Sequence, residues 1–72
     1  MNFKLYEKVK IKKDTFFPFR KIMVKAGEVG TIIDIYKSTI DENKLGYVVE
    51  LPKYDQTDPT FVFSEDSIEK IK

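Results

Sequence analysis

Residues 24–36 read Val-Lys-Ala-Gly-Glu-Val-Gly-Thr-Ile-Ile-Asp-Ile-Tyr, and the rest of the chain is interpreted around this segment. Its valine, threonine and isoleucine side chains favour an extended backbone over a helix. Gly27 precedes most of this run and allows the positive φ of a tight turn. Gly30 lies just inside the run, which indicates a bulge or the close approach of another backbone. We therefore predict a turn at Gly27, followed by a central strand over residues 29–37.

Both faces of this central strand carry apolar side chains, so the pattern leaves its orientation open. Ile33 and Ile35 share one face, whereas Ile32 and Tyr36 share the other. Apolar residues on both faces are typical of a bent barrel strand, which contributes to the core on both sides of its bend. We take Ile33 as a core residue and expect Ile33→Ala to be strongly destabilising.

Four more short strands are expected from alternating or short apolar runs bounded by turn residues. Ser64, followed by Glu65 and Asp66, predicts a single helical turn with a serine cap and acids in its first turn. The chain is thus expected to form one all-β domain over residues 1–72, with five strands that suit a small closed sheet. The further strands are expected at 7–13, 47–51, 60–63 and 68–71, and the loops at 14–23, 38–46 and 53–59.

The composition excludes several kinds of site. The 72 residues include no cysteine, histidine or tryptophan, so a thiolate nucleophile and a cysteine zinc site are ruled out. The usual acid-base group near neutral pH is also missing. We find no nucleophile–base pair or phosphate loop, and we expect no enzymatic activity, no metal and no cofactor. No apolar run is long enough to span a membrane, and no signal-peptide core is present, so a cytoplasmic location is expected.

The net charge of +1 is unevenly distributed along the sequence. Residues 1–25 carry a net charge of +6, and residues 26–72 carry a net charge of −5. A basic face beside aromatic side chains can follow a phosphate backbone and stack bases, which makes a nucleic-acid-binding domain the alternative function. The competing interpretation is a solvated face paired with acids of a neighbouring strand. This lysine stripe consists of Lys8, Lys10, Lys12, Lys13 and Lys25.

The order of these elements carries a resemblance. An alternating first strand precedes a long first loop, a Gly-x-x-Gly-Thr-Ile bend follows over residues 27–32, and one turn over residues 64–67 precedes the last strand. This order resembles the SH3-like barrels of small bacterial and phage proteins and of KOW-like, ribosome-associated domains, and it is similar to that of the photosystem I accessory subunit of this fold class. The resemblance covers residues 6–71. It implies a five-stranded SH3-like barrel with a 3₁₀ turn before the last strand, but this fold class hosts many functions.

The long first loop is the leading candidate for a binding site. Aromatic and arginine side chains are enriched at interface hot spots, and Pro18 would stiffen the loop. We expect Phe17 above all to enter a partner pocket, so that Phe17→Ala weakens binding and leaves the melting temperature nearly unchanged. The alternative is that the phenylalanines fold back and plug the end of the barrel, an arrangement expected more for Phe16 and Phe19.

Arg20 and Lys21 are expected to be exposed in both arrangements and to steer the loop towards an acidic rim on the partner. Tyr36, Tyr47 and Tyr54 are considered as an aromatic groove beside the loop, with Tyr54 as the best surface candidate; the alternative is half-buried barrel tyrosines. The predicted function is a small non-catalytic intracellular module that binds a protein partner as a regulatory, inhibitory or accessory subunit of a larger complex. An exposed phenylalanine loop is also compatible with a symmetric dimer.

Overall fold

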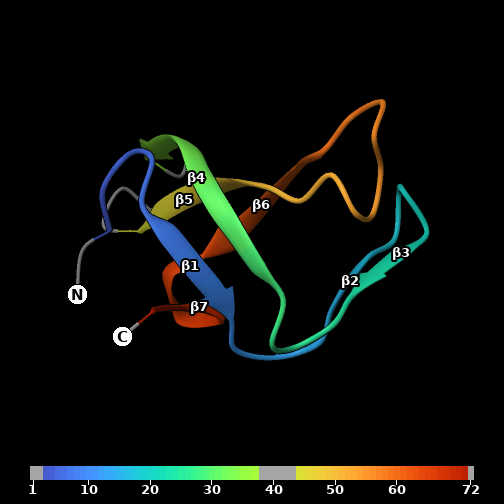
Figure 1. Cartoon of the computed structure of the whole chain (residues 1–72), viewed down its shortest axis with the longest axis horizontal. Coiled ribbons are helices and arrows are strands. Elements are labelled where there is room, and N and C mark those ends of the chain that lie inside the picture. The colour runs from blue at the N-terminus through green and yellow to red at the C-terminus, as the bar shows by residue number, and fades with distance from the viewer. Residues whose placement is uncertain (1–2, 38–43, 72) are drawn as a thin grey trace.

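The computed structural model describes residues 3–37 and 44–71, and within them the protein is all-β (Figure 1). About 52% of these residues lie in strands, and their one helical element is a single 3₁₀ turn. No helix in this part of the chain has the length and hydropathy needed to cross a membrane. The elements are β1 (Lys8–Ile11), β2 (Thr15–Phe17), β3 (Ile22–Val24), β4 (Val29–Lys37), β5 (Leu45–Glu50), β6 (Thr60–Ser64), η1 (Glu65–Ser67) and β7 (Ile68–Lys70).

Five of the seven strands in the described ranges form one antiparallel sheet, in the order β6-β5-β4-β1-β7. β2 and β3 pair with each other in a separate two-stranded hairpin. β6 and β7 are the edges of the larger sheet and do not pair with each other, so this sheet is open. The all-β fold and the five-stranded sheet are confirmed, whereas closure into a barrel is not.

The two glycines explain how the central strand begins, and β4 has the bounds predicted for it. Gly27 has a φ of +95°, a conformation that side chains disfavour, and it forms the turn before the strand. Gly30 packs directly on the neighbouring strand, since a Cβ atom there would lie 2.4 Å from Cγ1 of Val49 and 2.8 Å from the Glu50 carbonyl oxygen. The predicted close approach at Gly30 is therefore confirmed.

A β-bulge at Ile33 explains why both faces of β4 are apolar. Ile32 pairs with Val49 and Asp34 pairs with Val48, so Ile33 is an extra residue without a partner in the register. The inward face changes parity at this point. Ile32 is fully buried, whereas Ile33 is only partly buried, and the prediction of Ile33 as the core residue was wrong.

Core side chains alternate along the other strands as predicted. In β5, Tyr47 and Val49 point inward, and in β6 Phe61 and Phe63 do the same. Phe3, which precedes β1, packs edge-on against Tyr47 with ring centroids 5.3 Å apart. The buried core consists of Phe3, Val9, Ile11, Val24, Ile32, Tyr47, Val49, Leu51, Phe61, Phe63 and Ile68.

The predicted helical turn before the last strand is present as η1. Ser64 is its N-cap residue, but its hydroxyl lies 3.1 Å from the Ser67 hydroxyl and caps no backbone N–H. The turn leads directly into β7, where Ile68 enters the core. The loop predicted over residues 38–46 falls mostly outside the described residues, and its last two positions already belong to β5.

Candidate functional site

The chain between β1 and β4 is a β-hairpin and not the irregular loop predicted over residues 14–23. The Arg20 N–H donates to the Phe17 carbonyl oxygen at 3.1 Å and closes a turn. Pro18 occupies the second position of this turn, where its fixed φ is favourable. Lys21 completes the connection with a φ of 56°. The paired residues are Thr15–Val24, Phe16–Met23 and Phe17–Ile22.

The outer face of the hairpin exposes large apolar side chains. Phe16 and Met23 are cross-strand neighbours and are 54% and 43% exposed, and Phe19 in the turn is fully exposed. Neither phenylalanine folds back to plug a barrel end. Lys21, beside them in the turn, is exposed as predicted. We call Phe16, Phe19 and Met23 the hairpin patch, and Figure 1 shows the hairpin at one end of the molecule.

Phe17 points to the opposite side and packs on the core. Its ring makes edge-to-face contacts with Phe61 and Phe63, at centroid distances of 5.1 and 5.4 Å. Successive residues of a strand face opposite sides, so an outward Phe16 places Phe17 inward. The prediction of Phe17 as the exposed anchor was therefore wrong, and Phe17→Ala is now expected to destabilise the protein.

Arg20 fixes the hairpin to the connection between β5 and β6. Its guanidinium donates to the backbone carbonyls of Asp58 and Thr60, and to the Asp55 carboxylate at 3.1 Å. The guanidinium carbon lies 4.0 Å from the ring centroid of Phe61, within the range of a cation–π contact. The side chain is only 23% exposed, so the prediction of an exposed Arg20 was wrong. We call this set of contacts the arginine clamp.

Asp55 is held in position to receive this guanidinium. Its carboxylate also accepts the backbone N–H groups of Thr57 and Asp58, at 3.0 and 3.2 Å. The Asp58 N–H, the Arg20 guanidinium and the Thr57 N–H together lower the pKa of Asp55 below its ordinary value. The carboxylate is therefore ionised at neutral pH, when it binds the guanidinium most strongly.

The tyrosines considered for the binding surface do not form a common groove. Tyr54 is partly buried on the inner side of the hairpin, where its hydroxyl accepts the Lys25 N–H at 3.1 Å and its ring meets Phe61 edge-on. Tyr36 is exposed and covers Gly46 near the end of β4, which lies at the far end of the molecule from the hairpin (Figure 1). Tyr47 is fully buried in the core.

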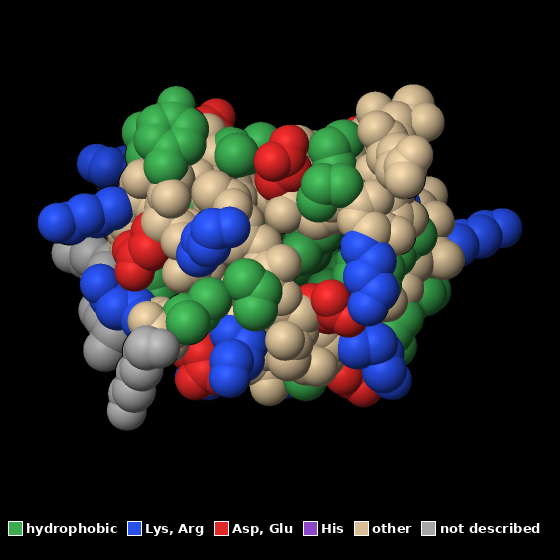
Figure 2. All heavy atoms as spheres, viewed as in Figure 1, with side chains coloured by type: hydrophobic (Ala, Val, Ile, Leu, Met, Phe, Trp, Pro, Cys, Tyr) green, Lys and Arg blue, Asp and Glu red, His purple; other side chains and the backbone are tan. Residues whose placement is uncertain are grey.

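The lysine stripe is exposed, but acidic side chains lie beside it. Lys10 pairs with Glu69 across β1 and β7, and Lys25 forms an ion pair with Asp14 at 3.1 Å. The Ala26 N–H and then the Lys25 ammonium lower the pKa of Asp14. In the view of Figure 2, basic and acidic side chains are interspersed over the surface. The exposed lysines of the stripe are Lys8, Lys10, Lys12, Lys13 and Lys25.

Sequence reasoning missed two features of this surface. Met23 was placed in a loop, although the inward Ile22 and Val24 on either side of it form the alternation of a short strand. The arginine clamp joins Arg20 to residues 55–60, and no local pattern in the sequence indicates a contact over that separation. The only signal in the sequence is that a loop arginine needs acidic or carbonyl partners, and this does not say where in the chain those partners lie.

Comparisons with known proteins give no assignment. No family model matches the chain, and neither the comparison with curated proteins nor that with solved structures gives a match. Across residues 3–37 and 44–71, no group of three or more acidic side chains is placed to hold a metal ion. The exposed side chains of the hairpin and the lysine stripe are therefore the features that point to a function.

Proposed function

We propose that this protein is a small non-catalytic interaction module that binds a protein partner through the hairpin patch. The observation that carries the proposal is the exposure of three large apolar side chains on the outer face and the turn of a hairpin whose other face is fixed to the core. Aromatic and methionine side chains are enriched in protein interfaces. Burial of Phe19 in a partner pocket would remove a fully solvated ring from water, which favours association.

The attachment of the hairpin supports this role. A docking element that is ordered before binding loses less conformational entropy on association. The arginine clamp and the turn at Pro18 provide such order next to the hairpin patch. Lys21 adds an exposed positive charge, which favours a partner pocket with an acidic rim. The module would then act as a regulatory, inhibitory or accessory subunit of a larger complex.

We also infer an SH3-like arrangement from the order of the elements. β1 precedes a long connection, β4 begins between Gly27 and Gly30, and a 3₁₀ turn comes directly before β7. The resemblance in the sequence was based on these elements. The strand order β6-β5-β4-β1-β7 in the sheet supports the same arrangement. A bacterial or phage origin, the cytoplasmic location and the lack of catalytic activity stay predictions.

The test is a pull-down with the tagged protein from a lysate of its own cells, with and without nuclease treatment and at two salt concentrations. Between about 0.1 M and about 1 M salt the Debye length falls from about 10 Å to about 3 Å, so electrostatic contacts weaken and apolar contacts persist. We expect a protein band that survives nuclease and high salt. The double variant Phe16→Ser/Phe19→Ser should lose this band, whereas Val62→Ser, at an exposed position of β6, should keep it.

Other outcomes would contradict the proposal in specific ways. Recovery of nucleic acid alone, released by salt, would instead favour the lysine stripe as a nucleic-acid site. A band that the double variant retains would move the contact surface away from the hairpin patch. Self-association that the double variant abolishes, with no other protein bound, would identify a second copy of the chain as the partner.

A further inference from the structure

The edge strand β6 has one side without a partner strand. It pairs with β5 along its whole length without a bulge, and no other described strand pairs with it. The Leu51 N–H donates to the Pro59 carbonyl oxygen at 2.7 Å just before β6. In the antiparallel ladder, Phe61 and Phe63 are therefore the next positions hydrogen-bonded to β5, and the alternate residues direct their N–H and C=O groups away from it. These alternate residues are Thr60, Val62 and Ser64.

The arginine clamp leaves this edge open. Arg20 donates to the Thr60 carbonyl oxygen at 2.5 Å, and its guanidinium lies over the ring of Phe61, which is on the inner face of the strand. A carbonyl oxygen can accept two hydrogen bonds, so the Thr60 oxygen keeps one position free. No described residue forms a hydrogen bond with the outward N–H and C=O groups of Val62, and this residue is 46% exposed.

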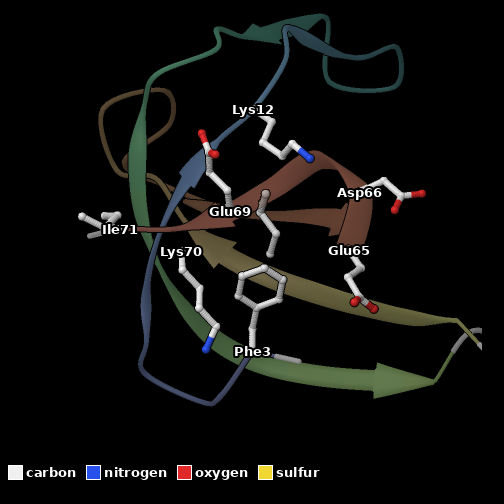
Figure 3. A pocket seen from close by; sticks show the side chains of 8 residues that line it. Phe3, Lys12, Glu65, Asp66, Glu69, Lys70 and Ile71 are labelled. Atoms are coloured by element: carbon white, nitrogen blue, oxygen red, sulfur yellow. The ribbon is translucent and has the colours of Figure 1, made fainter. Parts of the chain in front are cut away.

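The two edges of the sheet differ in charge. β6 reads Thr-Phe-Val-Phe-Ser and contains neither a charged residue nor a proline, whereas β7 reads Ile-Glu-Lys. Figure 3 shows the charged side chains of β7, Glu69 and Lys70, beside the basic Lys12 and the acidic Asp66. Edge strands are commonly protected from further pairing by charges, bulges or proline. β7 has such protection, and β6 does not.

We propose that β6 is the contact strand of a symmetric dimer, in which it pairs antiparallel with β6 of a second copy of this chain about Val62. The sequence of the strand is self-complementary in this register. Each Val62 lies opposite the same residue of the other copy, and Thr60 lies opposite Ser64 of the other copy. Cross-strand pairs of β-branched and of hydroxyl side chains stabilise a sheet, and no like charges meet within the strand.

Pairing at β6 also removes apolar surface from water. On the outer face of the sheet Val62 lies opposite Val48 of β5, which is half-buried. In the dimer this valine row continues across the contact, so each exposed Val62 gains an apolar neighbour on its open side. On the inner face Phe61 and Phe63 keep their contacts with Phe17, so the monomer does not have to rearrange.

The same geometry limits the assembly to two copies. A two-fold contact uses the β6 edge of both copies, and the charged β7 edges are then the only strand edges left in the described sheet. The contact is one strand of five residues from each copy. This is small against the roughly 1,200–2,000 Å² of a stable interface, so we expect a weak dimer with a Kd between about 0.1 and 1 mM.

The experiment is a concentration series of the full ¹⁵N-labelled chain from about 20 μM to about 2 mM, followed by sedimentation equilibrium and NMR. The average mass should rise from one chain towards two. The amide signals of Val62 and Ser64 should shift with concentration, and their hydrogen exchange should slow. The exchange of Phe61 and Phe63 should not change, because their N–H groups are bonded to β5 in the monomer.

Charged variants at the two-fold axis test the register. Val62→Lys and Val62→Glu each place like charges opposite each other and should weaken the dimer about tenfold. An equimolar mixture of the two variants should restore it, because the lysine then lies opposite the glutamate. The matched control is Val29→Glu, at an exposed valine of the inner strand β4, which should leave the dimer unchanged. Urea denaturation checks that every variant is folded.

The hairpin patch offers a competing contact surface, which one further variant separates from β6. The double variant Phe16→Ser/Phe19→Ser should dimerise as the wild type does, because the hairpin belongs to a separate two-stranded sheet.

Four results would overturn the inference. The first is a chain that stays monomeric over the whole concentration series. The second is a dimer that both Val62 variants form as readily as the wild type, and the third is a dimer that the double hairpin variant abolishes. The fourth is a set of concentration-dependent changes at Ile68 and Lys70 instead of Val62 and Ser64, since the contact would then lie at β7.

Discussion

The five-stranded sheet and the hairpin contain similar apolar side chains, but they are stabilised in different ways. In the sheet, each strand is hydrogen-bonded to a neighbour, and alternate side chains enter one core. The hairpin has only its own ladder of two short strands. It is joined to the rest of the molecule through Phe17, Ile22 and Val24 on its inner face and through the arginine clamp.

This difference shows how a short chain exposes apolar surface and still folds. The inner face of the hairpin and the clamp provide its attachment, so its outer face is not needed for stability. Elements that are joined by few side chains also open locally at a lower free energy than core strands do. Substitutions on the inner face should therefore change stability, and those on the outer face should change binding.

The largest loss of stability is expected in the sheet, at Ile32. This side chain is fully buried in β4, and Ile32→Ala should lower the free energy of unfolding by about 3–4 kcal/mol through lost burial and a residual cavity. Ile33→Ala, in the neighbouring bulge, should cost about 1 kcal/mol because its side chain is partly exposed. Urea denaturation measures both values. Equal losses would show that the bulge does not separate a core position from a surface position.

The next largest effect is expected on the inner face of the hairpin. Phe17→Ala removes edge-to-face contacts with Phe61 and Phe63 and should cost about 2–3 kcal/mol. The matched variant is Phe19→Ala, in the exposed turn of the same hairpin, which should change stability by less than about 0.5 kcal/mol. Thermal and urea unfolding compare the two. A Phe17→Ala variant as stable as Phe19→Ala would break the distinction between the two faces.

Short-range patterns were enough to predict most of the sheet. The bounds of β4, the turn at Gly27, the inward faces of β5 and β6 and the 3₁₀ turn all follow from local alternation and turn residues. Ile33 was misplaced because a bulge reverses the alternation, and the sequence of β4 is apolar on both sides of that point. Barrel closure depends on how distant edges meet, which no local pattern specifies.

The candidate site was predicted only in part. The aromatic first connection was recognised, but its content of Phe and Pro concealed two three-residue strands, so the inward and outward phenylalanines were exchanged. Arg20 was predicted to be exposed because its partners lie 35 to 40 residues further along the chain. Charge and aromatic content identify a candidate segment, whereas its tertiary contacts determine which side it presents.

A smaller effect of opposite sign is expected in the core of the sheet. The buried Tyr47 hydroxyl lies near the Phe3 backbone without a well-formed hydrogen bond to any described residue, and burial raises its pKa. A buried polar group without a partner costs about 1–3 kcal/mol. Tyr47→Phe keeps the ring and should therefore raise the free energy of unfolding by about 1 kcal/mol. A loss of stability in urea denaturation would mean that the hydroxyl is hydrogen-bonded in solution.

The smallest effect concerns the arginine clamp and should appear as a pH dependence. The pKa of Asp55 is lowered in the folded protein, first by the Asp58 N–H and then by Arg20, so folding favours the ionised carboxylate. Its contribution to stability is full above the unfolded-state pKa of about 3.9 and is lost as the pH falls through the lower folded-state pKa. Asp55→Asn should be less stable than the wild type at neutral pH, and urea denaturation should show this difference shrinking below about pH 4.

The same substitution in an Arg20→Gln background separates the two causes. The Asp58 N–H is retained there, so Asp55→Asn should still have a pH-dependent effect on stability, but a smaller one than in the wild type. Equal effects in the two backgrounds would mean that the guanidinium does not contribute to the ionisation of Asp55. The clamp would then act through the carbonyls of Asp58 and Thr60 and through the Phe61 ring, and the hairpin, unlike the sheet, would still depend on one side chain for its polar attachment.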